Sequence, residues 1–181
     1  MTDFPFPDLT LETAPPESRR AMAATAKHLG HLPSALARMA ASPQLMDGFL
    51  KASGLFESST LDPLARETLV MTMAVRNGCH ICIAMHTAAL TRLDADAGLI
   101  ADLRTGHPAA DPRLAALQVF IHAVLETAGT VSDEQLAAFF AHGYTARNAL
   151  EVVLGIGAYT MSTLANRMTR SPVDDHLAAF A

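Results

Sequence analysis

The sequence predicts an all-α protein, a multihelical bundle of about eight or nine helices with no sheet. Half of the residues are apolar, tryptophan is absent, and alanine, leucine and methionine are frequent. This composition is typical of packed helices, because the β-branched residues that favour strands rarely cluster. Apolar residues recur every three or four positions, most clearly between Pro112 and Thr127, which is the spacing of one buried helical face. No segment alternates between apolar and polar residues as a half-buried strand does.

The chain of 181 residues has the size of one domain and can bury a core without help from disulfides or metals. We therefore expect residues 1–181 to form a single helical domain. Residues 1–15 are rich in proline and lack helical periodicity. We expect them to form an extended arm that wraps over the body or over a neighbouring subunit.

Turn and capping residues divide the first half of the chain into helices. Gly30 ends a helix that begins at Pro16, because glycine readily adopts the left-handed stop conformation. Pro33 fits the first turn of the second helix, and Ser42-Pro43 separates it from the third. Asp62 followed by proline is an N-cap signal for the fourth. These helices are expected at about 16–29, 33–41, 44–56 and 63–76.

The same signals divide the second half. Asn77-Gly78 closes the fourth helix, and the fifth begins around Cys79. Residues 106–108 form a loop, and Ser132 with Gln135 has the pattern of a capping box. The helices are expected at about 79–92, 94–103, 112–127, 132–141 and 146–168.

The charge and hydropathy patterns argue against nucleic acid and membrane partners. The formal net charge is −5 and Lys and Arg do not cluster, whereas nucleic acid phosphates require concentrated positive charge. The longest apolar stretch, residues 149–165, is interrupted by Glu151 and is too short and too rich in Gly, Ser and Thr to span a membrane. The first residues lack the basic start and apolar core of a secretory signal, so we expect a cytoplasmic location.

The two cysteines, Cys79 and Cys82, lie too close in sequence to staple distant segments, so they indicate a local redox or metal function. On a helix, Cys79, Cys82 and His86 fall within about 60° of one another and face one way. Asn77-Gly78 should place Cys79 in the first helical turn, where free N–H groups and the helix dipole stabilise a thiolate.

Glu67 is expected to face His86 across an antiparallel helix pair. Glu67 lies about 15 Å before the Asn77-Gly78 turn and His86 about 12 Å after it, so the two are at comparable depth. A carboxylate bound to an imidazole fixes its tautomer and raises its basicity. The sequence thus predicts a relay from Glu67 through His86 to Cys82, with Cys79 as the resolving thiol.

Other functions for the cysteine pair fit less well. A thioredoxin-like site follows a strand, whereas this one follows a helix, and haem attachment needs a histidine where Ile83 stands. Zinc could be bound by Cys79, Cys82, His86 and Glu67, although a helical Cys-x-x-Cys points its sulfurs less freely than a zinc knuckle does. The pair could also be two packed, inert cysteines.

The remaining histidines and the methionines suggest packing or surface positions. His80 points away from the face of Cys79 and is expected to be exposed. Met71, Met73 and Met85 are expected to fill the core, with a possible role in lining an apolar substrate pocket. Six further histidines have no recognisable partner spacing and are interpreted as surface or core residues rather than ligands: His28, His31, His107, His122, His142 and His176.

The spacing of the site residues resembles a known signature. Glu67, eleven intervening residues, Cys79-x-x-Cys82, three more residues and His86 are similar to the motif of alkylhydroperoxidase D-like (AhpD-like) proteins, within the carboxymuconolactone decarboxylase superfamily. The match is tight over about residues 61–90. Residues 30–33, 143–151 and 166–174 are similar to recurring features of the peroxidase-related branch.

The resemblance implies an all-helical fold, assembly into trimers or hexamers, and reduction of a small-molecule hydroperoxide. It implies that Cys82 attacks the peroxide and becomes a sulfenic acid, that Cys79 condenses with it, and that an unidentified thiol reductant regenerates the dithiol. His86 and Glu67 would relay protons, and no cofactor is expected. Decarboxylase members generally lack the cysteine pair, so its presence argues against lactone decarboxylation. The alternative is a helical zinc-binding or redox-sensing protein without peroxide turnover.

Overall fold

The computed structural model describes residues 5–181, which contain helices and no strand. The all-α prediction is therefore confirmed over this range. The helices are α1 Pro16–Leu29, α2 Ser34–Met39, α3 Pro43–Glu57, α4 Pro63–Arg76, α5 His80–Arg92, α6 Ala97–Thr105, α7 Pro112–Glu126, α8 Asp133–Ala141, α9 Ala146–Met168 and a 3-10 helix, η1, Asp175–Phe180. None of them, within residues 5–181, is long and apolar enough to cross a membrane.

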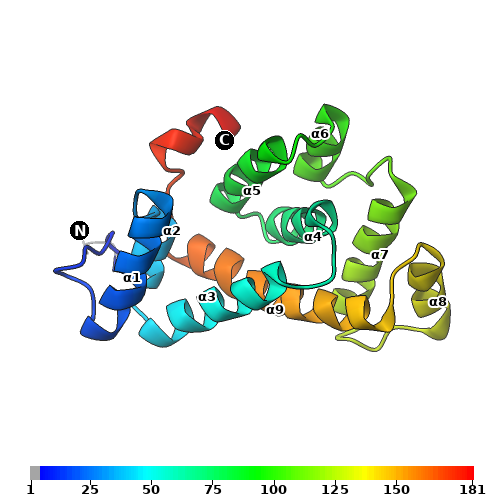
Figure 1. Ribbon diagram of the computed structural model, residues 1–181, viewed down its shortest axis with the longest axis horizontal. Helices are drawn as coiled ribbons and strands as arrows, with labels where there is room; N and C mark the ends of the chain where they lie inside the picture. Colours follow the sequence, from blue (N-terminus) through cyan, green and yellow to red (C-terminus); the bar gives the residue numbers. More distant parts are fainter. Residues whose placement is uncertain (1–4) are drawn as a thin grey trace.

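Helix α4 lies at the centre of the bundle, with α5, α6, α7 and α9 packed around it (Figure 1). The long helix α9 runs beneath α4 and also packs along α3. The main core forms between these helices and includes the fully buried side chains of Phe56, Leu69, Met73, Leu117 and Val152. The methionines Met71 and Met73 are also fully buried, as the sequence predicts. This arrangement holds the start of α5 against the C-terminal half of α9.

Most helix boundaries follow the predicted capping chemistry. Gly30 closes α1 with a φ of 80°, Asp62 caps α4 through Ala65 N, and Ser132 and Gln135 form the capping box of α8. The prediction for the sixth helix is wrong at its start, because Asp94 adopts a left-handed conformation with a φ of 52° and Asp96 provides the cap instead. Asp94 and Asp96 are both plausible N-cap residues, so the sequence did not determine where the helix begins.

The segments at the two ends of the chain pack against the helices. In the N-terminal arm, Ala14 is buried and the Asp8 carboxylate lies 2.5 Å from Arg38 Nε. The described part of the arm therefore contacts the body, while residues 1–4 of the predicted arm lie outside the described residues. At the other end, η1 was not predicted. It packs on α5 through the buried Leu177, and Arg104 Nη1 donates a hydrogen bond of 2.6 Å to the carbonyl of Phe180.

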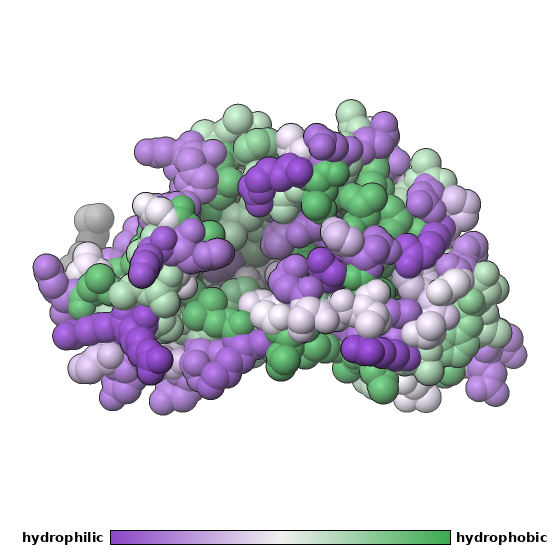
Figure 2. Space-filling model, in the orientation of Figure 1, coloured by the Kyte–Doolittle hydropathy of each residue, from purple (hydrophilic) through white to green (hydrophobic). Residues whose placement is uncertain are grey.

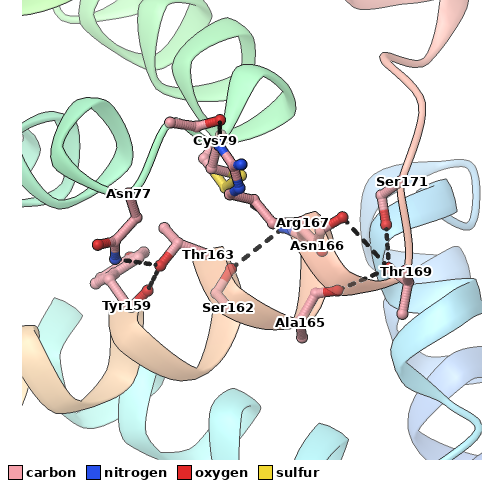
Figure 3. The surroundings of a disulfide bond; sticks show 12 residues. Asn77, Cys79, Tyr159, Ser162, Thr163, Ala165, Asn166, Arg167, Thr169 and Ser171 are labelled. Carbon is pink, nitrogen blue, oxygen red and sulfur yellow. Dashed lines mark hydrogen bonds between the residues drawn. A yellow bond between two sulfur atoms is a disulfide. The ribbon is translucent and has the colours of Figure 1, made fainter.

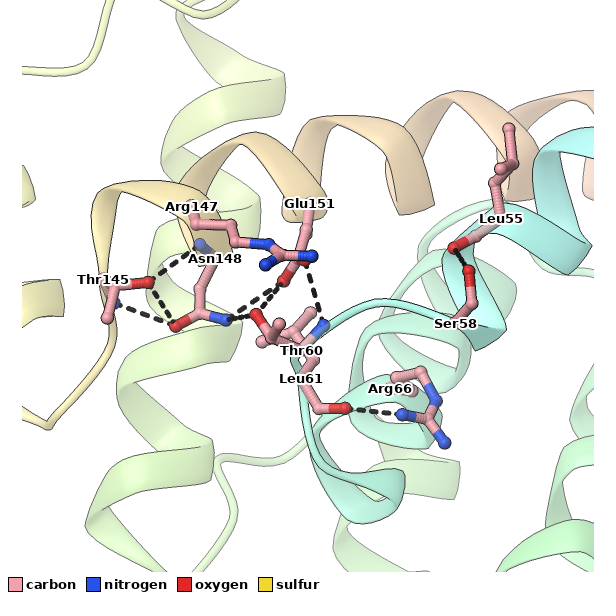
Figure 4. Close-up of polar contacts among 9 residues, drawn as sticks. All are labelled: Leu55, Ser58, Thr60, Leu61, Arg66, Thr145, Arg147, Asn148 and Glu151. Atoms are coloured by element: carbon pink, nitrogen blue, oxygen red, sulfur yellow. Dashed lines mark hydrogen bonds and ion pairs between the residues drawn. The ribbon is translucent and has the colours of Figure 1, made fainter.

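A polar cluster joins the N-terminal end of α9 to the loop before α4 (Figure 4). The Glu151 carboxylate accepts hydrogen bonds from Thr60 N at 2.9 Å and Thr60 Oγ1 at 2.7 Å. It also accepts hydrogen bonds from Asn148 Nδ2 at 3.1 Å and Arg147 Nε at 3.0 Å. Thr145 and Asn148 form the capping box of α9. This cluster, Thr60, Thr145, Arg147, Asn148 and Glu151, is called the Glu151 cluster below.

Candidate active site

The two cysteines lie at the N-terminal end of α5 and form a disulfide with Cα atoms 5.3 Å apart. Cys79 is the N-cap of α5, one residue outside the helix that was expected to begin there, and Cys82 lies in its first turn. Gly78 has a φ of 62°, and a Cβ atom at this position would collide with Arg167. Arg167 Nη1 donates a hydrogen bond of 2.8 Å to the carbonyl of Gly78, which ties α9 to the turn before the cysteines.

The local electrostatics favour a thiolate at this position. The first N–H groups of a helix have no intrahelical acceptor, and the helix dipole places partial positive charge there. The Cys79 side chain makes no capping hydrogen bond to these groups. Both cysteines are buried, and Cys82 borders a hollow, described below. In the reduced protein, the helix N-terminus therefore stabilises the thiolate of Cys82. The hollow gives a small molecule access to its sulfur.

Glu67 and His86 meet as the depth count predicts. The Oε2 atom of Glu67, on α4, lies 2.8 Å from Nδ1 of His86, on α5. Both side chains are largely buried, with 13% and 17% of their surfaces exposed. The carboxylate accepts the Nδ1 proton, which leaves the Nε2 lone pair of His86 available to take a proton. His86 and Cys82 are one helical turn apart and border the same hollow.

Helix α9 supplies residues that the local motif did not reveal. Tyr159, Ser162 and Asn166 lie at offsets of zero, three and seven, so they share one face, and all are buried. Asn166 Nδ2 lies 3.4 Å from Cys82 Sγ, and the same group contacts Ser162 Oγ at 3.5 Å (Figure 3). The other amide atom, Asn166 Oδ1, is buried and has no hydrogen-bond partner among residues 5–181.

The ring of Tyr159 packs on the imidazole of His86. Its ring lies edge-on to His86, with centroids 5.6 Å apart. Burial raises the pKa of the Tyr159 hydroxyl, and the nearby charges of Glu57 and Glu67 add to this effect. The hydroxyl is therefore neutral at physiological pH and is available as a hydrogen-bond donor rather than as a base.

A hollow of about 230 Å³ lies directly beside Cys82 and His86. Figure 2 shows the surface recessed in the region where α2, α3 and α5 meet. The polar lining residues nearest the chemistry are His86, Tyr159, Ser162 and Asn166, and most of the others are apolar: Leu29, Pro33, Ala35, Leu36, Met39, Phe49, Leu50 and Met85. An apolar wall with a few polar groups at one end is typical of a small-molecule site.

Glu67 also borders a second hollow, of about 210 Å³, on the other side of the histidine. This hollow is polar and includes Arg66 and Arg92. The Glu67–His86 pair thus lies between an apolar hollow that Cys82 borders and a polar one that opens toward solvent. The carboxylate can therefore exchange a proton with water in the polar hollow.

The four predicted site residues therefore lie together, whereas the residues from α9 were missed. More than 70 residues separate Tyr159 and Asn166 from the cysteines, so no local spacing could place them. The sequence feature that could have revealed them is the row of polar side chains on one face of α9, which is otherwise apolar. His80 is exposed, as predicted. In this oxidised form both sulfurs are held in the disulfide, and within residues 5–181 no group of three or more possible metal ligands converges at the dithiol.

Comparisons with known proteins agree with this fold. Residues 41–120 match the model of the carboxymuconolactone decarboxylase family. A peroxidase-related protein from Ralstonia eutropha JMP134 has a TM-score of 0.82 at 19% identity, covering 95% of this chain and 93% of that one. A peroxidase-related protein from Silicibacter sp. TM1040 has a TM-score of 0.78 at 19% identity, covering 97% and 95%.

A third solved structure is a debrominase variant in complex with 2,3,4-tribromopyrrole, in which a cysteine is replaced by alanine. It has a TM-score of 0.77 at 15% identity, covering 99% of this chain and 96% of that one. No curated protein matches the sequence. Residues 41–120, which include the dithiol, thus match the carboxymuconolactone decarboxylase family, and the chain shares its all-helical fold with the AhpD-like and peroxidase-related structures.

Proposed function

We propose that the chain is a thiol-dependent peroxidase or disulfide oxidoreductase that reduces organic hydroperoxides through Cys79 and Cys82. The single observation that carries the proposal is the Glu67–His86 pair, joined at 2.8 Å, on the same apolar hollow as Cys82. A paired imidazole one helical turn from a thiol is the arrangement that general-base activation requires. Two cysteines that only pack in the core would need neither His86 nor Glu67 nearby.

In the first step, His86 Nε2 takes the proton of the Cys82 thiol. The thiolate attacks the outer oxygen of the hydroperoxide, the S–O bond forms and the O–O bond breaks. Cys82 becomes a sulfenic acid, and the leaving alkoxide takes a proton from the His86 imidazolium and departs as an alcohol. Glu67 stabilises the imidazolium between these two transfers.

In the second step, the Cys79 thiol attacks the Cys82 sulfenic acid and releases water, which forms the disulfide seen in the structure. Two equivalents of an external thiol then reduce the disulfide by exchange and leave as their own disulfide. Because Cys82 borders the hollow, a small thiol reaches its sulfur first, and Cys79 is the leaving group.

The lining of the hollow supports an apolar substrate. Leucine, methionine and phenylalanine side chains remove an alkyl or aryl group from water, while hydrogen peroxide gains nothing from such contacts. Asn166 places its Nδ2 beside the sulfur, and its Oδ1, which has no partner among residues 5–181, can accept a hydrogen bond from the O–H group of a bound hydroperoxide. We therefore propose that organic hydroperoxides are better substrates than hydrogen peroxide.

Reductive dehalogenation of a small aromatic ring is a second candidate. The apolar hollow beside Cys82 supports it, together with the fold shared with a debrominase. In this reaction the thiolate attacks bromine, the ring carbon gains a proton, and Cys79 displaces bromide from Cys82 to form the disulfide. The two electrons that reduce the carbon–bromine bond come from the cysteine pair, and the external thiol restores them by reducing the disulfide.

The proposal also includes a cytoplasmic location and assembly into a homo-oligomer. The outer face of α9 supports assembly, because it exposes apolar residues at helical spacing: Leu150, Val153, Leu164 and Met168, with 50–74% of their surfaces accessible. Apolar residues also reach the surface along the lower edge of Figure 2, where α3 and α9 run in Figure 1. Light scattering after size-exclusion chromatography measures the subunit number directly.

The test is consumption of cumene hydroperoxide by the reduced protein with excess dithiothreitol, followed by mass spectrometry of the Cys79–Cys82 peptide. We expect turnover with disulfide formation in the wild type. Turnover should be lost in Cys82→Ser and should fall about 10²–10⁴-fold in His86→Ala. His80→Ala is the matched control, since His80 is an exposed histidine on the same helix, and it should retain full activity.

Full activity in Cys82→Ser would contradict the mechanism. A disulfide that forms without peroxide turnover would instead favour a redox sensor. Tribromopyrrole in place of the hydroperoxide tests the second candidate, because debromination releases bromide in proportion to disulfide.

A further inference from the structure

A second group of side chains, remote from the dithiol chemistry, converges between the two ends of the chain. His31 follows α1, whereas Asp174 and His176 belong to the C-terminal segment that passes above α2 in Figure 1. Each of the three offers one ligand atom, and these atoms all lie within 4.8 Å of one another. The two imidazole rings are 4.3 Å apart, edge to face. Both histidines are exposed, as the sequence interpretation allows, but the fold brings them together although no spacing in the sequence links them.

Neighbouring groups orient two of the three side chains. Ser34 donates to the Asp174 carboxylate through Oγ at 2.5 Å and through its backbone N–H at 3.2 Å. Nδ1 of His31 lies 3.3 Å from the carbonyl of Leu29, to which it can only donate. The proton therefore belongs on Nδ1, and the lone pair of His31 is on Nε2. Metal sites commonly orient their histidine and carboxylate ligands through outer contacts of this kind.

The cluster borders a hollow of about 390 Å³, so ligands other than protein atoms have room to bind. Leu29, Pro33 and Met85 line this hollow and the one beside Cys82 as well. Arg92 is the cationic residue on the lining, and it weakens rather than strengthens the attraction for a cation. The affinity must therefore come from directed ligand bonds and not from long-range charge.

We propose that His31, Asp174 and His176 bind one divalent transition-metal ion of the zinc class, with a fourth position open to the hollow. Two imidazoles and one carboxylate are ligands that zinc accepts when three protein groups hold it. Tetrahedral ligands at about 2.1 Å from zinc lie about 3.4 Å apart. The present spacing, up to 4.8 Å, thus requires the exposed histidine side chains to approach one another by up to about 1.4 Å.

The ion would connect the C-terminal segment to the loop between α1 and α2. Leu177, the residue after His176, is buried in the cluster that contains Cys79 and Cys82. A metal bond at His176 therefore fixes the segment that packs on the dithiol helix. Because an ion that binds only the folded state stabilises it, zinc should raise the melting temperature.

The experiment uses the full-length, untagged protein in its oxidised form, so that the disulfide prevents the cysteines from binding metal. Zinc is titrated in by calorimetry. We expect one equivalent to bind, and we expect His31→Ala and His176→Ala each to weaken binding at least tenfold. His28→Ala is the matched control, because His28 is an exposed histidine on α1 outside the cluster, and it should bind as the wild type does.

Circular dichroism and the melting temperature without metal check that each variant is folded, and His176→Gln provides a second, more conservative change. Undiminished binding in His31→Ala and His176→Ala would overturn the site. So would the absence of binding to oxidised wild type. Binding that occurs only after reduction, and is lost when Cys79 and Cys82 are replaced by serine, would also overturn it, because the dithiol would then be the ligand.

Discussion

Each end of α9 borders a polar cluster built around a helical glutamate, Glu151 of α9 itself and Glu67 of α4, yet the two clusters differ in how the carboxylate is bound. In the Glu151 cluster, the carboxylate accepts hydrogen bonds from Thr60, Arg147 and Asn148 (Figure 4). At the dithiol end, His86 is the hydrogen-bond donor to the Glu67 carboxylate among residues 5–181. A saturated carboxylate fixes structure, whereas one paired with a single imidazole can stabilise its change of charge.

The clusters also differ in what surrounds them. The capping and hydrogen bonds of the Glu151 cluster join α9 to the loop before α4. The dithiol end borders an apolar hollow and retains a buried amide oxygen, Asn166 Oδ1, without a protein partner. A buried polar atom without a partner costs about 1–3 kcal/mol. Such a cost is retained where a ligand can supply the missing hydrogen bond.

The largest difference between the clusters should appear in activity. Glu67→Gln keeps the shape of the side chain but removes the charge that stabilises the His86 imidazolium, so kcat/KM for an organic hydroperoxide should fall about 100-fold. Glu151→Gln should leave it unchanged. Steady-state kinetics of the two variants measures this directly. Equal losses of activity in both variants would show that the distinction between the two carboxylates is false.

The next effect concerns stability. Glu151→Ala removes the acceptor for the Thr60 N–H and hydroxyl and for the Asn148 amide, which should lower the free energy of unfolding by about 1–3 kcal/mol. Urea denaturation of the variant and of wild type gives the difference. The peroxide turnover of the folded fraction should remain at the wild-type level. A stability loss below a few tenths of a kcal/mol would mean that the cluster is not structural.

The pH dependence of stability in the Glu151→Gln variant provides a check. Burial of Glu151 opposes its charged form, but hydrogen bonds from Thr60, Asn148 and Arg147 outweigh it and lower the pKa below the ordinary 4.5. A lowered folded-state pKa contributes stability that is present above pH 4.5 and is lost as the pH falls through the folded-state value. The difference in stability between wild type and Glu151→Gln should therefore shrink as the pH falls below 4.5.

The two clusters also show what the sequence could reveal. The caps of α4, α8 and α9 are local, and the meeting of Glu67 with His86 follows from one turn between two helices. The contacts between Glu151 and Thr60, between Asn166 and Cys82, and between His31 and His176 each span more than 80 residues. Such contacts depend on how whole helices pack, which apolar periodicity does not specify.

A smaller effect is expected at Asn166. Its Nδ2 lies 3.4 Å from Cys82 Sγ, and a donor at this distance stabilises the thiolate more than the thiol. Asn166→Ala should therefore raise the pKa of the Cys82 thiol by about one unit, equivalent to about 1.4 kcal/mol. Ultraviolet absorbance of the thiolate in the reduced protein, with Cys79 replaced by serine, reports the titration. Asn148→Ala, in the Glu151 cluster, is the matched control and should leave this pKa unchanged.

The smallest effect is expected at Gly157, which lies between the two clusters on the face of α9 opposite Gly155. A Cβ at Gly155 would lie 2.6 Å from a ring carbon of Phe56 and 2.9 Å from Leu69, whereas a Cβ at Gly157 meets nothing within 4 Å. Alanine at 157 should therefore stabilise the helix by about 0.5–1 kcal/mol, while alanine at 155 should destabilise the core by about 1–3 kcal/mol. Chemical denaturation of both variants measures the pair.

Whether Gly157→Ala raises or lowers the free energy of unfolding also tests the proposed assembly. Gly157 is exposed on the helix that carries Leu150, Val153, Leu164 and Met168. In an isolated subunit, the added methyl group acts only through helix propensity, and its effect is independent of protein concentration. If a second copy packs closely on this face, the methyl group disrupts the contact, and the loss of stability depends on concentration. Denaturation at two protein concentrations therefore distinguishes an exposed helix face from one that is covered in the assembly.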